Sequence, residues 1–172
     1  MFKIGEFIIY GNNGVCKVTG VGSMDSPGIP KDRLYYTLEP CANTGSKIFT
    51  PADNEKVIMR PVISREEALN LIEDIKNIQT LWVSDEKRRE TEYKEAVRTC
   101  DCRDLVKIIK TIYLRKQDRL AKGKKVMACD ERYFRIAEEN FYGELAVSLD
   151  MNKEDVKRYV IDRVEQLEAL QE

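Results

Sequence analysis

The period of the hydrophobic pattern changes near residue 64, and this change constrains the fold more than any other feature of the sequence. Before it, apolar and polar residues alternate, as in residues 15–19 (VCKVT), which is typical of half-buried β-strands. After it, apolar residues recur every three or four positions, which is typical of amphipathic helices. We therefore expect an α+β protein of two domains, a β-sheet domain over residues 1–62 and an all-α helical domain over residues 63–172.

The first domain is expected to contain five short strands separated by turns. Gly11 and Gly14 follow the first strand and Gly45 precedes the fourth. We assign these glycines to turns, because no G-x-x-x-x-G-K-[ST] pattern indicates a phosphate cradle. Short strands with short turns favour a small, strongly bent antiparallel barrel, as in SH3-like or Tudor-like modules. The expected strands cover residues 7–10, 15–21, 34–38, 47–50 and 57–61.

The second domain is expected to form a small helical bundle of five helices. It begins with a capping box, Ser64-Arg65-Glu66-Glu67, and apolar stripes on its third and fourth helices can pack against each other. The helices are expected to start at residue 64 and then to cover about 84–98, 101–122, 128–149 and 152–170. The boundary between the domains falls within residues 60–64 or just after the first helix, near residues 77–80, and we place it after residue 62.

The chain has no histidine and five scattered cysteines, and both facts weigh against an enzyme. Without histidine there is no imidazole for a catalytic triad, an acid–base pair or a metal site. Cys100 and Cys102 form a C-x-C, but no second close cysteine pair completes four zinc ligands. We expect reduced cysteines, no cofactor, no metal and no catalytic residues. The start MFKIGEF has no signal-peptide core and the apolar runs are too short to span a membrane, so we expect a cytoplasmic protein.

The net charge of −1 conceals an uneven distribution of charge. Residues 76–135 contain 17 basic and 10 acidic residues, whereas residues 136–172 contain 4 basic and 10 acidic ones. A basic middle segment favours contact between one surface and a nucleic acid. The alternative is that these charges form solvated helix faces paired at i and i+4.

Several stretches, in matching order along the chain, resemble one family of bacterial transcription regulators. Residues 2–15 (FKIGEFIIYGNNGV) have an apolar-Gly-acidic start, an Ile-Tyr strand and a glycine-closed turn. The other stretches are Pro51–Asn54, the single Trp82 followed by Lys87–Arg89 and Tyr93-Lys94, Leu114–Leu120 with Gly123–Lys125, and Gly143–Ala146. On these motifs the chain resembles the CarD/CdnL family, and its first domain resembles the RNA polymerase-interacting module of transcription-repair coupling factors.

This resemblance implies a Tudor-like N-terminal domain that binds the β subunit of bacterial RNA polymerase and a helical domain that contacts promoter DNA. In the family, a tryptophan placed against the minor groove at the upstream edge of the melted bubble stabilises the open complex, and the matching residue is Trp82. Polymerase contacts in the family include an arginine near the end of the strand before the Pro-Ala-acidic turn. The matching position here is Phe49. A strand edge can still pair through its backbone, so we expect the polymerase to bind the strand formed by Lys47, Ile48, Phe49 and Thr50.

Trp82 and the lysines near residue 124 each have a second interpretation. A lone tryptophan could fill a seam between domains, but a planar apolar residue close to three basic residues also suits a wedge in the minor groove. The two lysines that follow Gly123 either complement the helix dipole or contact DNA, and the two roles are compatible. The predicted DNA-binding residues are Trp82, Lys87, Arg88, Arg89, Lys124 and Lys125.

Three functions remain compatible with the sequence. The preferred one is a regulator, monomeric in its active complex, that binds the polymerase β subunit together with the minor groove and phosphates of promoter DNA. The second is a protein-interaction module that uses the barrel edge without touching DNA. The third is an enzyme with a cysteine nucleophile.

Overall fold

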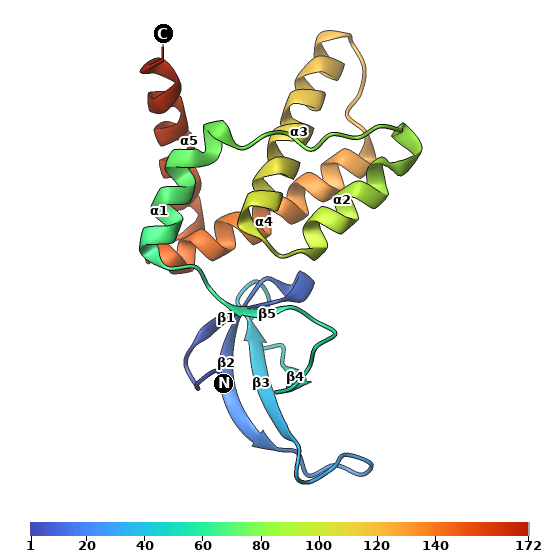
Figure 1. The fold of residues 1–172 in the computed structure, drawn as a ribbon, viewed down its shortest axis with the longest axis vertical. Coiled ribbons are helices and arrows are strands. Elements are labelled where there is room, and N and C mark those ends of the chain that lie inside the picture. Colours follow the sequence, from blue (N-terminus) through green and yellow to red (C-terminus); the bar gives the residue numbers. More distant parts are fainter. Residues whose placement is uncertain (172) are drawn as a thin grey trace. The chain divides into compact units, whose positions relative to one another are not determined.

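The computed structural model describes residues 1–171, and the chain divides into two compact units, Met1–Val62 and a second that begins at Ile63. Figure 1 shows strands in the first unit and helices in the second. The expected α+β fold class, a sheet followed by five helices, is confirmed. Within residues 1–171, none of the helices combines the length and the apolar character needed to cross a lipid bilayer.

The first unit is a single antiparallel sheet of five strands in the order β4-β3-β2-β1-β5. The sheet is open, so the expected closed barrel is wrong. Closure would require the two outer strands to pair, and these have only four and three residues. The strands are β1 (Phe7–Tyr10), β2 (Val15–Ser23), β3 (Leu34–Pro40), β4 (Ile48–Pro51) and β5 (Met59–Pro61).

The alternating pattern of the sequence builds the core of the sheet. Ile8, Cys16, Val18 and Leu38 are fully buried, whereas Lys17 and Thr19, on either side of Val18, are exposed. A register shift between Val18 and Gly20 marks a bulge that bends β2. The turn assigned to the first glycines is a short 3-10 helix, η1 (Gly11–Asn13), and a Cβ atom at Gly11 would lie 2.7 Å from Val57 Cγ1.

The second unit contains five helices with a shared apolar core. The expected capping box is present, since Ser64 Oγ accepts from Glu67 N at 3.1 Å and Glu67 Oε2 accepts from Ser64 N at 2.7 Å. The α4 helix contacts both α3 and α5, as Figure 1 shows. The elements are α1 (Arg65–Asp74), η2 (Ile75–Asn77), η3 (Glu86–Arg88), α2 (Arg89–Arg98), α3 (Cys102–Ala121), α4 (Ala128–Leu149) and α5 (Lys153–Ala169).

The second helix starts later than the sequence suggests. We expected it from residue 84, but the α-helix begins at Arg89 and a 3-10 turn precedes it. Asp85 is extended, and its carboxylate accepts from Lys87 N at 3.0 Å, so Asp85 rather than Ser84 caps this element. Residues 79–85, between η2 and η3, form no helix or strand.

We expect Ser64→Ala to lower the free energy of unfolding by about 1 kcal/mol, because it removes the side-chain half of the capping box. Urea denaturation of the full chain, followed by circular dichroism of the helical signal, measures this change. Ser26→Ala, in an exposed turn of the sheet unit, is the control and should leave the curve in place. Equal curves for Ser64→Ala and the native chain would contradict the capping contribution.

Candidate functional site

Trp82 lies on the surface of the helical unit, in the segment between η2 and η3 that has no helix or strand. The residue is 81% exposed, whereas its neighbours Leu81 and Val83 are half-buried. Leu81 packs against the helical core, while Trp82 is turned to the solvent. Within the helical unit, the indole is therefore open to a flat partner.

The three basic residues after Trp82 differ in their surroundings. The Lys87 ammonium has no partner among residues 1–171, and Arg88 makes only an exposed pair with Glu92 at 3.8 Å. Such an exposed pair contributes little to stability, so both cations remain available to an anion. Arg89 is 15% exposed at its side chain, and its guanidinium donates to Glu86 and to Tyr93 Oη. Its position therefore suits holding the structure rather than contacting a phosphate.

A cluster of charges joins η3, α2, α3 and α4 below this surface. Arg115 donates to both Glu86 oxygens at 2.9 and 3.0 Å, and its Nε donates to Asp130 Oδ2 at 2.7 Å. Asp130 is 1% exposed, and its other oxygen accepts from Tyr93 Oη at 3.1 Å. Because a buried carboxylate needs a paired charge and hydrogen bonds, Arg115 satisfies a requirement of the core. The members of this Glu86 cluster are Glu86, Arg89, Tyr93, Arg115 and Asp130.

The pKa values within the Glu86 cluster follow from these contacts. Hydrogen bonds from Arg89 and then Arg115 lower the pKa of Glu86 to about 2. Burial raises the pKa of Tyr93 to about 12. At neutral pH the cluster therefore has an ionised Glu86 and a neutral Tyr93, whose hydroxyl group donates a hydrogen bond to Asp130.

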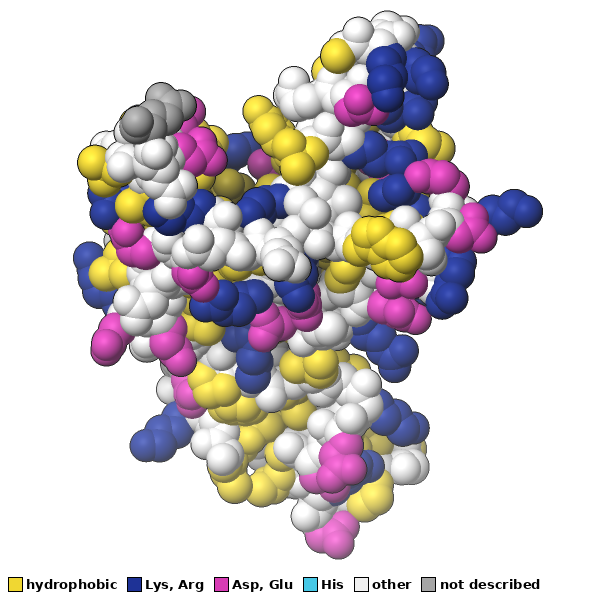
Figure 2. Space-filling view, turned by 45° about the horizontal axis from the view of Figure 1, so that its top comes forward, with side chains coloured by type: hydrophobic (Ala, Val, Ile, Leu, Met, Phe, Trp, Pro, Cys, Tyr) yellow, Lys and Arg dark blue, Asp and Glu magenta, His cyan; other side chains and the backbone are white. Residues whose placement is uncertain are grey.

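Lysines and arginines also gather at the C-terminal end of α3. Figure 2 shows dark blue side chains concentrated on this end of the helical unit. Lys124 and Lys125 are exposed in the loop that follows Gly123, whose φ is +70°. This loop is held in place because Arg119 Nε donates to Lys125 O at 2.8 Å and Lys124 N donates to Arg119 O at 2.8 Å. Both ammonium groups are therefore presented from an ordered turn.

In the sheet unit, β4 is an outer strand whose free edge can accept a further strand. Ala52 N donates to Leu34 O, so the hydrogen-bonded pairs on this ladder include Thr50 with Tyr36. By the same alternation, Phe49 lies at a non-hydrogen-bonded position, and its N–H and C=O groups point away from β3. The Phe49 side chain is 52% exposed, and Thr50 is 1% exposed. The backbone donor at the free edge is therefore Phe49 N, whereas Ile48 N faces the sheet.

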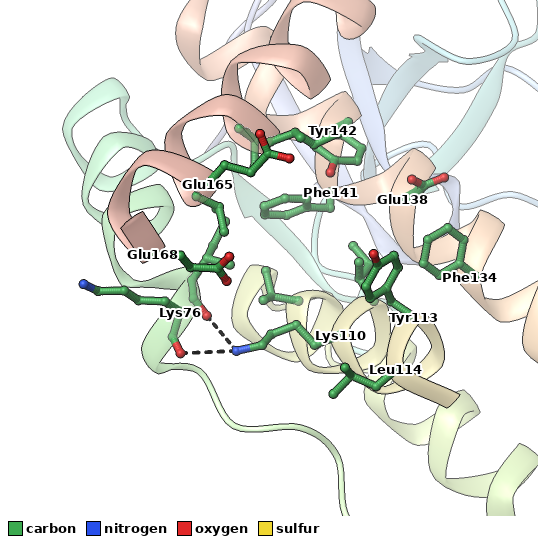
Figure 3. A pocket seen from close by; sticks show the side chains of 16 residues that line it. Lys76, Lys110, Tyr113, Leu114, Phe134, Glu138, Phe141, Tyr142, Glu165 and Glu168 are labelled. Carbon is green, nitrogen blue, oxygen red and sulfur yellow. Dashed lines mark hydrogen bonds between the residues drawn. The ribbon is translucent and has the colours of Figure 1, made fainter. Parts of the chain in front are cut away.

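A cavity of about 550 Å³ lies among α3, α4 and α5. Figure 3 shows Tyr113 and Phe134 on one side of it and Glu165 and Glu168 on the other. It also shows the Lys110 ammonium donating to the carbonyl oxygens of Ile75 and Lys76, at 3.0 and 3.4 Å. Burial lowers the pKa of Lys110. None of the residues predicted for DNA or polymerase contact lines this cavity.

The cysteines have surroundings that oppose a nucleophilic role. Burial raises the pKa of Cys16 to about 12 and raises those of Cys41 and Cys129. A cysteine nucleophile acts as its thiolate, so these shifts disfavour the third function. Cys102 is buried, and its Sγ donates to Glu144 Oε2 at 3.0 Å. Within residues 1–171, no three potential cysteine or carboxylate ligands lie together as a metal site would require.

The sequence did not indicate the Glu86 cluster as a unit. Glu86 and Arg89 are three residues apart on one helical turn, and this spacing is the only local signal. Arg115 and Asp130 come from α3 and α4, and their pairing depends on how those two helices pack.

An open sheet with a free strand edge can bind a partner by adding a strand to that edge. Residues 2–63, which span the N-terminal unit, match the family model of the CarD-like/TRCF RID domain. The match indicates a role connected with transcription and polymerase binding, and the family is an interaction domain, not a catalytic one. No curated protein matches the chain.

We expect the Glu86 carboxyl to titrate far below the ordinary value of 4.5, near pH 2. Because its pKa is lowered in the folded protein, its stabilising contribution is complete above about pH 4.5 and is lost as the pH falls through about 2. Carbon-13 NMR of the side-chain carboxyls measures the midpoint. Arg89→Gln should raise it toward 4.5, whereas a native midpoint at or above 4.5 would contradict the bridged geometry.

Proposed function

We propose that this protein is a transcription regulator that binds the RNA polymerase β subunit through its sheet unit and promoter DNA through its helical unit. The DNA contact lies at the upstream edge of the melted bubble and stabilises the open complex. The observation that carries the proposal is the match of residues 2–63 to the CarD-like/TRCF RID domain. The match covers the sheet unit, so the DNA contact rests on the helical unit's own surface.

The free edge of β4 supports the polymerase contact. A partner strand added there would pair with the Phe49 backbone, where both the N–H and the C=O point outward. This contact uses the main chain, so it does not require the arginine that the family has at this position. An arginine nevertheless lies close to the end of β4, since Arg33 Nη2 donates to Asp53 Oδ1, in the turn after this strand, at 2.9 Å.

The surface around Trp82 supports the DNA contact. Burying an aromatic side chain stabilises a fold, so the exposure of the Trp82 indole does not serve the stability of the helical unit. Lys87 and Arg88 lie five and six residues away in the sequence, with cations that can meet phosphates. A flat apolar ring that props open a base step beside cations that hold the backbone is the arrangement of a minor-groove wedge.

Stabilisation of the open complex requires a difference in affinity between two DNA states. A ligand that binds duplex and melted DNA equally well shifts no equilibrium. Lys87 and Arg88 meet phosphates in both states, so they add affinity without selecting a state. The Trp82 ring gains a stacking surface only where a step is already distorted, and it therefore supplies the selectivity.

The first test of the proposal concerns the edge of β4. Phe49→Pro removes the outward N–H and leaves the ladder to β3 intact, so affinity for the polymerase β subunit should fall about tenfold. Binding of the purified full chain, measured by calorimetry, gives the ratio. Phe49→Ala keeps the N–H and serves as the matched control, and it should bind more tightly than Phe49→Pro.

Equal affinities for Phe49→Pro and the native chain, with both folded by circular dichroism, would exclude strand addition at this edge. Ile48→Pro is unsuitable for this purpose, because Ile48 N faces β3 and its loss would weaken the sheet itself.

The second test concerns Trp82. Trp82→Ala should lose about 1–3 kcal/mol of open-complex stabilisation, in the range of a base–aromatic contact, while polymerase affinity stays the same. The lifetime of the open complex on one promoter, measured over a series of salt concentrations, reports this loss. Neutralising Lys87 and Arg88 together should instead weaken binding at every salt concentration and reduce the salt slope. An unchanged lifetime in Trp82→Ala would exclude the wedge and leave a module that binds polymerase alone.

A further inference from the structure

The segment that carries Trp82 has no helix or strand of its own, yet hydrogen bonds to α3 hold it on both sides. On the N-terminal side, the Lys110 ammonium donates to the carbonyl oxygens of Ile75 and Ile78. Leu81 N, next to Trp82, donates to Thr111 Oγ1 at 2.7 Å. Main-chain atoms before Trp82 are therefore fixed to the middle of α3.

On the C-terminal side, the anchor is the carboxylate of Glu86. Both of its oxygens accept from Arg115, which lies one helical turn beyond Thr111 on α3. Arg115 itself cannot move freely, because its Nε is bound to the buried Asp130 at 2.7 Å. Arg115 therefore connects the C-terminal side of the segment to the core of the helical unit.

We propose that the Glu86–Arg115 pair is a clamp that fixes Trp82 in its outward orientation before DNA is bound. This inference rests on the proposed role of Trp82 and adds a positioning residue, Glu86, that touches no DNA itself. A segment ordered in advance loses less conformational entropy on binding than a flexible one, so the clamp increases the share of the contact energy that appears as affinity.

The clamp and simple electrostatics predict opposite effects of neutralising Glu86 on the stabilisation of the open complex. Glu86 is a negative charge close to the basic surface, so its neutralisation alone should strengthen binding to DNA. If Glu86 positions Trp82, its neutralisation should weaken the stabilisation of the open complex instead. A second glutamate separates the two effects, because Glu90 is similarly exposed, 57% against 61%, and pairs with Arg132 rather than Arg115.

The experiment compares Glu86→Gln with Glu90→Gln in the full chain. Trp82 is the single tryptophan, so the fluorescence anisotropy of the free protein reports the motion of this side chain directly. We expect Glu86→Gln to lower the anisotropy and Glu90→Gln to leave it unchanged. With polymerase and promoter, Glu86→Gln should shorten the lifetime of the open complex about threefold to tenfold, as expected for a newly mobile contact residue. Glu90→Gln should leave the lifetime unchanged or lengthen it.

The two readouts separate the clamp from the function on which it rests. Native anisotropy in Glu86→Gln overturns the clamp, whatever the lifetime. Where Trp82→Ala shortens the lifetime, a lowered anisotropy in Glu86→Gln with an unchanged or lengthened lifetime also overturns the clamp, because the fixed orientation would then have no effect on function. Where Trp82→Ala leaves the lifetime unchanged, the wedge itself is excluded, and the anisotropy alone decides whether Glu86 fixes the orientation of Trp82. Both variants alter exposed side chains, and circular dichroism checks that they fold.

Discussion

The buried charge of Asp130 is the constraint on which the outer part of the helical unit depends. A carboxylate that is 1% exposed is stable only with a cation and hydrogen bonds around it, and Arg115 and Tyr93 supply them. This requirement fixes α2, α3 and α4 with respect to one another at one point. The remaining donors of Arg115 are then free to hold Glu86, and through Glu86 the start of the segment that leads into α2. One internal ion pair therefore holds the C-terminal end of a surface segment whose other end is bound to Lys110 and Thr111.

The sheet unit depends on a different constraint, the alternation of apolar and polar residues along short strands. Alternation puts Ile8, Val18 and Leu38 on one face and leaves the outer strands with unpaired backbone groups. Such edges usually carry features that oppose uncontrolled pairing. Here Pro51 and Pro61 end the two outer strands, so each edge offers few donors. The free edge of β4 is short, with Phe49 N as the donor in its middle, which suits pairing with one specific partner better than open-ended association.

The sequence predicted local structure well because local structure depends on local patterns. The five strands, the capping box at Ser64 and the glycine-closed end of α3 were all predicted from spacing and turn chemistry. Barrel closure was not predictable, because it depends on whether strands far apart in the sequence pair. The start of α2 was misplaced because residues 86–88 form a 3-10 turn, and Glu86 in this turn binds Arg115, 29 residues away, a contact that no local pattern indicates. Arg89 differs from its neighbours Lys87 and Arg88, because its guanidinium binds Glu86 and Tyr93, and the bonds of those two residues to Arg115 and Asp130 could not be predicted from spacing.

The separation between structural and available charges bears on the DNA contact proposed for the helical unit. Of the 17 basic residues between positions 76 and 135, several are bound to carboxylates or backbone carbonyls, as Arg89, Lys110 and Arg115 are. The positive charge that remains for phosphates is therefore smaller than the composition suggests, and part of it lies after Trp82 and at the end of α3. A modest electrostatic contact gives weak affinity for any duplex, which favours a protein whose selectivity comes from one apolar side chain. A single contact can act in this way only if its geometry is fixed, because an indole that samples many orientations gains little from any one of them. Arg115, which pairs with the buried Asp130 and also holds Glu86, therefore links the stability of the helical core to the fixed position of the segment that carries Trp82.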